Sequence, residues 1–343
     1  MSTAENTPKR KIDAPDTIDA KRKNVEMDGF QKWNILVPEL RKHSISFLGS
    51  KELNRYSQCS KTSYEETKEF NTIAPQTAIL GMVYDSDKSM FVHLKYPDLN
   101  YKHLYFAKVD ENSHKTTRHF DHPPEDFITI IEGNAVDAAI EYFIKQYKYV
   151  KTGTTQSIQI NSKKWPSEFK TILAISQAEK CIIHVYPTNY GECMSFLCGC
   201  SSIKDLELHT ATENANEITL TSEFIQSTMF KQLDRGVFKL NSLIQDAEFL
   251  ESRASYLFLK CDTISHNAIN RKIRNWYNGQ MDNHSFEIHF ITPRVVNRND
   301  ILFDLPFQPA WFNKYVIRRA DGRTASAFIG NDSFQFFVRL ESE

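Results

Sequence analysis

Short apolar runs recur through the second half of this 343-residue chain and constrain its fold more than any other feature. Each run is five or six residues long and is rich in residues that favour strands. The runs centre near Ile158, Ile182, Leu206, Leu257 and Phe286. The first three lie about 24 residues apart, the next gap is about twice as long, and the last is about 29 residues. Segments with helical spacing lie between the runs, most clearly residues 267–279, so we expect strands that alternate with helices.

Two architectures fit this spacing. A strand and then a helix every 20 to 29 residues or so is typical of a leucine-rich-repeat-like solenoid. In that case the strands lie side by side as a parallel sheet, and one face of the sheet is open for a partner. The fixed Leu and Asn positions of the repeat are missing, so the chain would be a degenerate version. The alternative is an ordinary α/β domain whose strands fall at similar intervals.

The C-terminal segment predicts an antiparallel meander of three strands over residues 314–338. Asp321-Gly322 is a strong signal for a tight turn, and Gly330-Asn331-Asp332 supplies the second turn. Residues 73–150 predict a β-rich linker region with a helix at about 135–148, where the apolar residues have helical spacing.

Residues 30–72 predict short helices. Pro38 suits a first helical turn, and Leu40, Ile45 and Leu48 form a roughly helical apolar stripe. About forty residues cannot bury a deep core alone, so this module must pack against its own chain or another protein. The expected fold class is therefore α+β or α/β: a small N-terminal helical module, then a β-rich, leucine-rich-repeat-like body over residues 151–340 that ends in the antiparallel hairpin or meander.

Residues 1–28 are polar and predict a disordered tail with two basic clusters. A pair of such clusters is typical of a nuclear-import signal, although acidic residues between them neutralise their charge. The clusters are Lys9, Arg10 and Lys11, and Lys21, Arg22 and Lys23. Over the whole chain 42 Lys and Arg balance 43 Asp and Glu, which excludes a bulk basic surface for nucleic acid.

No catalytic signature is present: we find no Walker loop, dinucleotide fingerprint, nucleophile elbow or HExxH motif. The nearest approach to a metal site is Cys193, Cys198 and Cys200, with His184 and His209 nearby. Phe196 and Leu197 lie within that cluster and favour buried thiols instead. His119, Asp121 and His122 precede two prolines and are interpreted as a solvated loop. We therefore predict no catalytic residue, no metal and no cofactor.

Six cysteines in a chain of this length indicate free thiols in a reducing compartment, either the cytoplasm or the nucleus. The N-terminus lacks the apolar centre of a secretory signal, and no apolar run approaches the roughly 18 residues of a membrane span.

The segment over residues 36–70 resembles an F-box. It opens with Leu36-Val37-Pro38-Glu39, continues with Ile45 and Leu48 on one helix face and with Leu53 at the next helix, and closes with Ser57-Gln58-Cys59-Ser60-Lys61. Together with the C-terminal sequence VIRRADGRTASAFIGNDSFQFFV, this ending resembles the nematode-type F-box proteins with a type-two F-box-associated domain. In that family a helix that ends in Trp and then Gly precedes the terminal hairpin, as Ile269–Gly279 does here.

The resemblance implies a non-catalytic, substrate-recognition subunit of an SCF-type cullin–RING E3 ubiquitin ligase. The F-box would bind a Skp-type adaptor, and through it a cullin scaffold, while the C-terminal domain would hold a protein substrate. The implied adaptor contacts are Leu36, Pro38, Ile45, Leu48 and Leu53. No substrate-binding residue is implied. The alternative is a protein-interaction scaffold that uses the repeat-like body outside any ligase.

Overall fold

The computed structural model divides the chain into two compact units, residues 1–70 and residues 71–343. It describes residues 38–45, 56, 59, 62–63, 74–82, 89–96, 101–108, 113–119, 127–148, 150, 153–200, 202–211, 218–281, 284–292 and 295–339. None of the helices in these ranges is long and apolar enough to cross a membrane.

The first unit contains helix α2 (Pro38–Ile45), whose first residue is the expected proline. Ile45 is fully buried, whereas 54% of Leu40 is exposed. Five positions along a helix correspond to a rotation of about 140°, so these two side chains do not form one stripe. No small helical F-box is evident among the described residues of this unit, and this part of the fold-class prediction is wrong.

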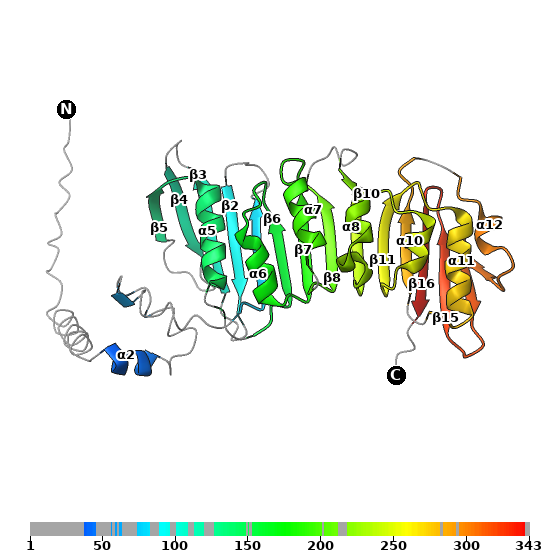
Figure 1. The fold of residues 1–343 in the computed structure, drawn as a ribbon, viewed down its shortest axis with the longest axis horizontal. Coiled ribbons are helices and arrows are strands. Elements are labelled where there is room, and N and C mark those ends of the chain that lie inside the picture. Colours follow the sequence, from blue (N-terminus) through cyan, green and yellow to red (C-terminus); the bar gives the residue numbers. More distant parts are fainter. Residues whose placement is uncertain are drawn as a thin grey trace, which may run out of the picture. The chain divides into compact units, whose positions relative to one another are not determined.

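The second unit is one mixed sheet of sixteen strands (Figure 1). Its first five strands are antiparallel neighbours in the order of the chain. These strands are β1 (Thr77–Met82), β2 (Ser89–Lys95), β3 (Tyr101–Lys108), β4 (Ser113–His119) and β5 (Phe127–Glu132). Helix α5 (Ala135–Tyr147) follows, and the side chain of Asn134 caps it by accepting hydrogen bonds from the backbone of Val136 and Asp137.

The centre of the sheet is parallel, and β6 joins it to the first part by pairing in parallel with β1. Its six main strands succeed one another in a single direction across the sheet, and the short β9 (Thr219–Leu220) pairs with β10. The six are β6 (Ser157–Asn161), β7 (Lys180–Val185), β8 (Asp205–Thr210), β10 (Arg235–Ser242), β11 (Tyr256–Cys261) and β12 (Ser285–His289).

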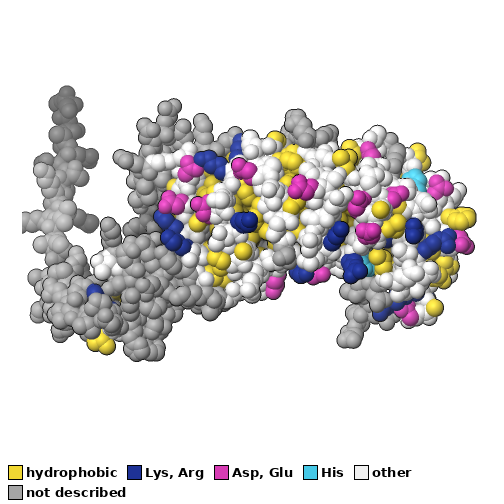
Figure 2. All heavy atoms as spheres, in the orientation of Figure 1, with side chains coloured by type: hydrophobic (Ala, Val, Ile, Leu, Met, Phe, Trp, Pro, Cys, Tyr) yellow, Lys and Arg dark blue, Asp and Glu magenta, His cyan; other side chains and the backbone are white. Residues whose placement is uncertain are grey.

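Helices in the connections between these strands lie on one face of the sheet (Figure 1). A right-handed crossover places its helix on a given face, and the strand order never reverses between β6 and β12, so successive helices fall on the same face. The helices are α6 (Glu168–Ser176), α7 (Tyr190–Cys198), α8 (Ser222–Gln226), α9 (Thr228–Lys231), α10 (Asp246–Glu251) and α11 (His266–Tyr277). On the surface of the helical layer that faces solvent, acidic and basic side chains are interspersed with apolar ones (Figure 2).

The chain ends in an antiparallel part that joins the sheet through pairing of β12 with β16. Helix α12 (Arg298–Leu302) precedes it. Its strands are β13 (Gln308–Trp311), β14 (Lys314–Arg318), β15 (Thr324–Ile329) and β16 (Ser333–Arg339). Aromatic side chains pack this part against the rest of the sheet. The ring centroids of Trp276 in α11 and Phe336 lie 5.5 Å apart, and those of Phe336 and Phe286 of β12 lie 5.4 Å apart.

The strands expected near Ile158, Ile182, Leu206, Leu257 and Phe286 do lie side by side in parallel, with β10 between the third and the fourth. The predicted leucine-rich-repeat-like body is nevertheless wrong. The parallel strands are the centre of a larger mixed sheet with antiparallel strands on both sides, and residues 77–132 belong to the same sheet. The strand over residues 235–242 fills the double-length gap noted in the sequence.

A buried lysine links two of the helices in the helical layer. Lys272 of α11 is 2% exposed, and its Nζ donates to the carbonyl oxygens of Phe249 at 2.6 Å and Ser252 at 3.0 Å, at the end of α10. Burial lowers the pKa of Lys272 to about 7. The uncharged amine can still donate to both carbonyls, so the contact does not depend on the charge.

We expect stability to depend on pH through Lys272. Its folded pKa lies below that of the unfolded chain, so between about pH 7 and pH 10 the unfolded state binds more protons and the free energy of unfolding rises with pH. Relative to Lys272→Met, the wild type should gain about 2 kcal/mol between pH 7 and pH 9 in urea unfolding. The exposed neighbour Arg271→Met is the control, because it removes a cation from the same helix and leaves the buried amine of Lys272 in place. If the difference in free energy of unfolding between the wild type and Lys272→Met stays constant or falls as the pH rises, this account is contradicted.

Candidate functional site

The face of the parallel sheet that faces away from the helices carries a continuous set of polar and aromatic side chains. Side chains alternate along each strand, so every second residue of β7, β8 and β11 is buried under the helices and its neighbours are only half-buried. We call the half-buried side of β6–β12 the open face. Strand register aligns its residues in rows, one of which is Lys180, Asp205, Arg235 and Tyr256 on four adjacent strands.

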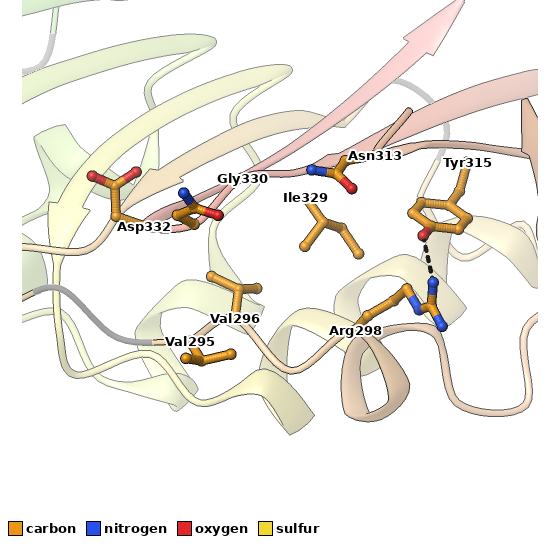
Figure 3. A pocket seen from close by; sticks show the side chains of 9 residues that line it. Val295, Val296, Arg298, Asn313, Tyr315, Ile329, Gly330 and Asp332 are labelled. Carbon is orange, nitrogen blue, oxygen red and sulfur yellow. Dashed lines mark hydrogen bonds between the residues drawn. The ribbon is translucent and has the colours of Figure 1, made fainter. Parts of the chain in front are cut away.

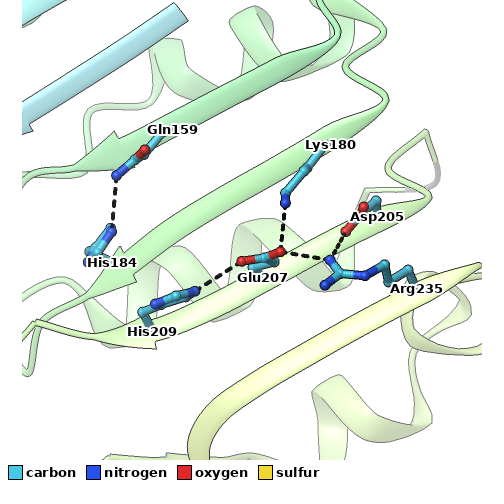
Figure 4. A network of polar contacts seen from close by, with 7 residues as sticks. All are labelled: Gln159, Lys180, His184, Asp205, Glu207, His209 and Arg235. Carbon is cyan, nitrogen blue, oxygen red and sulfur yellow. Dashed lines mark hydrogen bonds and ion pairs between the residues drawn. The ribbon is translucent and has the colours of Figure 1, made fainter. Parts of the chain in front are cut away.

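Glu207 is the centre of the first cluster on the open face (Figure 4). Its Oε1 accepts from Lys180 Nζ and from Arg235 Nη1, each at 2.7 Å, and its Oε2 accepts from His209 Nε2 at 3.2 Å. Arg235 Nη1 also donates to Asp205 Oδ1 at 3.1 Å. Two cations and two carboxylates therefore balance in formal charge across three neighbouring strands.

The environment of Glu207 holds it ionised. Burial alone would raise the pKa of its carboxyl group, but the hydrogen bonds from Lys180, Arg235 and His209 outweigh burial and lower the pKa to about 2. At neutral pH Glu207 therefore has no proton to donate, and it acts as a fixed acceptor that orients its three partners. Burial raises the pKa of the adjacent Asp205 against the influence of Arg235.

Two histidines on the open face are held neutral. The rings of His184 and His209 lie 5.2 Å apart, and the Gln159 amide nitrogen lies 3.3 Å from His184 Nε2. Burial, the neighbouring His209 and Lys239 together lower the pKa of His184 to about 4. Burial also lowers the pKa of His209, although its hydrogen bond to Glu207 opposes the shift. At neutral pH these rings act as polar hydrogen-bonding groups without charge.

Glu287 of β12 is the centre of a second cluster with the same arrangement. Its Oε1 accepts from His289 Nε2 at 2.5 Å and from Gln335 Nε2 at 2.9 Å, and its Oε2 accepts from the Tyr256 hydroxyl at 3.3 Å. The guanidinium of Arg235 lies over the ring of Tyr256, 5.2 Å from its centroid. Tyr256 therefore connects the two carboxylate clusters, and burial and Glu287 raise its pKa to about 12.

Aromatic rings continue the open face beyond the second cluster. The ring centroids of Phe258 and His289 lie 5.0 Å apart. The ring of Phe337 in β16 stacks on that of Tyr256, with 6.5 Å between the centroids, and its centroid lies 6.3 Å from that of Phe328. Flat rings, neutral imidazoles and oriented amides are suited to binding a protein partner, since interfaces combine aromatic contact with hydrogen bonds.

The predicted adaptor contacts fall mostly outside this description. Pro38 begins α2, and the buried Ile45 ends it. Leu36, Leu48 and Leu53 lie outside the described residues, as do both basic clusters of the tail. The described residues therefore do not test whether these side chains share one contact surface, and the adaptor and import assignments stay predictions.

The cysteine cluster lies in the helical layer. Cys193 is buried in α7, and burial raises its pKa and raises that of Cys200 to about 11, so both thiols stay protonated at neutral pH. His184 and His209 belong to the open face, on the other side of the sheet. Within the described part of the chain, no three His, Cys, Asp or Glu side chains are placed to hold a metal ion. His119 ends β4, and Asp121 and His122 lie outside the described residues.

Sequence reasoning missed the open-face network, although a local signal for it exists. Strands β8 and β12 each carry Glu-x-His, as Glu207-Leu208-His209 and Glu287-Ile288-His289. Residues two apart on a strand share a face, so each pair can form a hydrogen bond. The polar alternation of these strands therefore marks the side of the sheet away from the helices.

Comparison with known proteins finds a relative in Caenorhabditis elegans that is named as an uncharacterized F-box protein. The two sequences are 21% identical over 360 residues, which cover 99% of this chain and 91% of that protein. No family model matches the chain, and no solved structure matches it. The similarity supports an F-box protein.

We expect His184 to stay neutral far below the usual range of histidine. In an NMR titration of the imidazole signals, with His184→Gln to assign the resonance, its midpoint should fall near pH 4. In the unfolded chain the same ring takes up a proton near pH 6.5, so the wild type should lose stability as the pH falls from about 6.5 towards 4. His184→Gln should lack that part of the loss. A midpoint near pH 6.5 would show that the ring is not held as described.

Proposed function

We propose that this protein is the substrate-recognition subunit of an SCF-type cullin–RING E3 ubiquitin ligase. Similarity to a protein named as an F-box protein along nearly the whole chain is the observation that carries the proposal. The start Leu36-Val37-Pro38-Glu39 and the Ser/Cys-rich stretch near Cys59 support it. The division into a small first unit and a large second unit suits a protein that joins two partners.

In this proposal residues 36–53 bind the Skp-type adaptor. The contacts are Leu36, Pro38, Leu48 and Leu53, while Ile45, which is buried in the unbound chain, supports the segment from within. Leu40, half-exposed on α2, is available for an additional apolar contact. The chain itself supplies no catalytic residue, because a conjugating enzyme recruited by the RING subunit would transfer ubiquitin.

The second unit, which we propose to correspond to the type-two F-box-associated domain, binds the protein substrate on its open face. Helices cover the other face, so the open face is the side on which polar and aromatic groups stay within reach of a partner. Glu207 and Glu287 are already paired with donors on their own sheet, so the aromatic rings and amide groups of the open face are the groups that contact the substrate.

The second candidate function is a protein-interaction scaffold that never enters a ligase. The open face favours it as much as it favours a ligase subunit, since both functions need a surface for a protein partner. The two functions differ in the first unit, because a scaffold has no use for adaptor contacts at residues 36–53.

The test is a pull-down of purified Skp-type adaptor by the full-length chain. We expect the wild type to retain the adaptor and the double variant Pro38→Ala with Leu48→Asp to lose it, because a carboxylate would be buried in an apolar contact. Glu207→Gln, on the open face, is the matched control and should bind like the wild type. If the wild type fails to bind, or if the double variant binds equally well, the ligase proposal is wrong and the scaffold is preferred.

A further inference from the structure

A cavity of about 660 Å³ lies at the C-terminal end of the second unit, apart from the open face (Figure 3). One wall comes from the segment before α12, and the opposite wall comes from β14 and from the turn between β15 and β16. The lining residues are Val295, Val296, Arg298, Asn313, Tyr315, Ile329, Gly330, Asn331 and Asp332.

The surroundings of this cavity are unusually apolar for a surface. Val295 is 89% exposed, and beside the lining residue Asn313 stand Trp311 and Phe312, which are 74% and 83% exposed and whose rings meet at 4.6 Å. Hydrophobic side chains are visible at this end of the unit (Figure 2). Exposed apolar side chains that concentrate in one place mark a binding surface more often than scattered ones do.

The two ends of the cavity carry opposite charges. Figure 3 shows Arg298 and Tyr315 at one end, Asp332 at the other, and Val295, Val296 and Ile329 between them. Arg298 Nη1 donates to the Tyr315 hydroxyl at 3.0 Å. Within the described ranges, neither Arg298 nor Asp332 forms an ion pair, so both charges remain available to a ligand.

The edge of the sheet next to the cavity is poorly suited to adding a strand. Strand β13 is the outermost strand on this side and is exposed along its length. Pro309, opposite Tyr315 in the register, has no N–H to donate, and proline on an edge strand opposes further pairing. A partner at this end is therefore held by side-chain contacts in the cavity.

We propose that this cavity binds an extended segment of a partner protein. The segment presents an apolar side chain to Val295, Val296 and Ile329, with an acidic residue on one side for Arg298 and a basic residue on the other for Asp332. The polarity of the cavity fixes the direction in which the segment lies. If the proposed function holds, this segment belongs to the substrate. Only this identification of the partner rests on the proposed function, because binding of the segment to the cavity needs no adaptor.

The test is selection of peptides from a displayed random library on the full-length chain, followed by affinity measurement with the enriched peptides. We expect an acidic and a basic residue to flank an apolar one. Arg298→Glu should weaken binding about tenfold, because it turns an attraction into a repulsion. The double variant Arg298→Glu with Asp332→Lys should prefer the same peptide with its two charges exchanged.

Leu243→Ser removes an exposed apolar side chain elsewhere on the unit and is the matched control, which should bind like the wild type. The substituted side chains are on the surface, so every variant should still unfold cooperatively on heating, with only a small loss of stability in Arg298→Glu from the missing hydrogen bond to Tyr315. If no peptide is enriched, if the enriched peptides lack the flanking charges, or if Arg298→Glu binds them as well as the wild type, the proposal is overturned. Failure of the adaptor pull-down would not affect this test, because no adaptor is present in it.

Discussion

The parallel strands from β6 to β12 advance in one direction across the sheet, and this strand order determines which face the helices cover. Each crossover from β6 to β12 places its helix on the same face, so that face acquires a packed apolar core and the other receives no helical cover from these connections. A sheet that reversed direction would have helices on both faces. The core residues of the antiparallel parts, such as Phe336, pack into the same helical layer. The open face is therefore a consequence of topology.

Because the helices that connect β6 to β12 lie on the opposite face, the charged side chains of the open face pair with one another. Glu207 and Glu287 do so in the same way: each accepts from the histidine two residues later on its strand and from donors on neighbouring strands. Arg235, which lies over Tyr256, joins the two clusters. Such cross-strand pairs contribute to the stability of the sheet, and they also position rings and neutral imidazoles for a partner. The same side chains thus serve both the fold and the proposed recognition of a protein.

Local patterns in the sequence were enough to locate most of the parallel strands and the helix around Trp276, because period-two and period-3.6 spacing are local properties. The turn at Asp321-Gly322 was equally visible, and Gly322 has the positive φ that such a turn requires. The pairing of β1 with β6 could not be predicted, since nothing in the sequence near residue 77 marks residue 157 as its neighbour. Strand β10 was missed because Gly236 and the alternating polar residues weaken its apolar run. The open-face network depends on register between distant strands, and only its Glu-x-His pairs were visible locally.

The central claim is that one face of the parallel sheet is packed and the other is open, and thiol labelling along β7 tests it most directly. Cys181 is fully buried, and the next side chain, Ile182, belongs to the open face. In native Ile182→Cys protein treated with iodoacetamide, tandem mass spectrometry should find label on the introduced thiol, with Cys181 labelled only after unfolding. Native labelling of Cys181 as fast as the introduced thiol, or protection of both, would contradict the account.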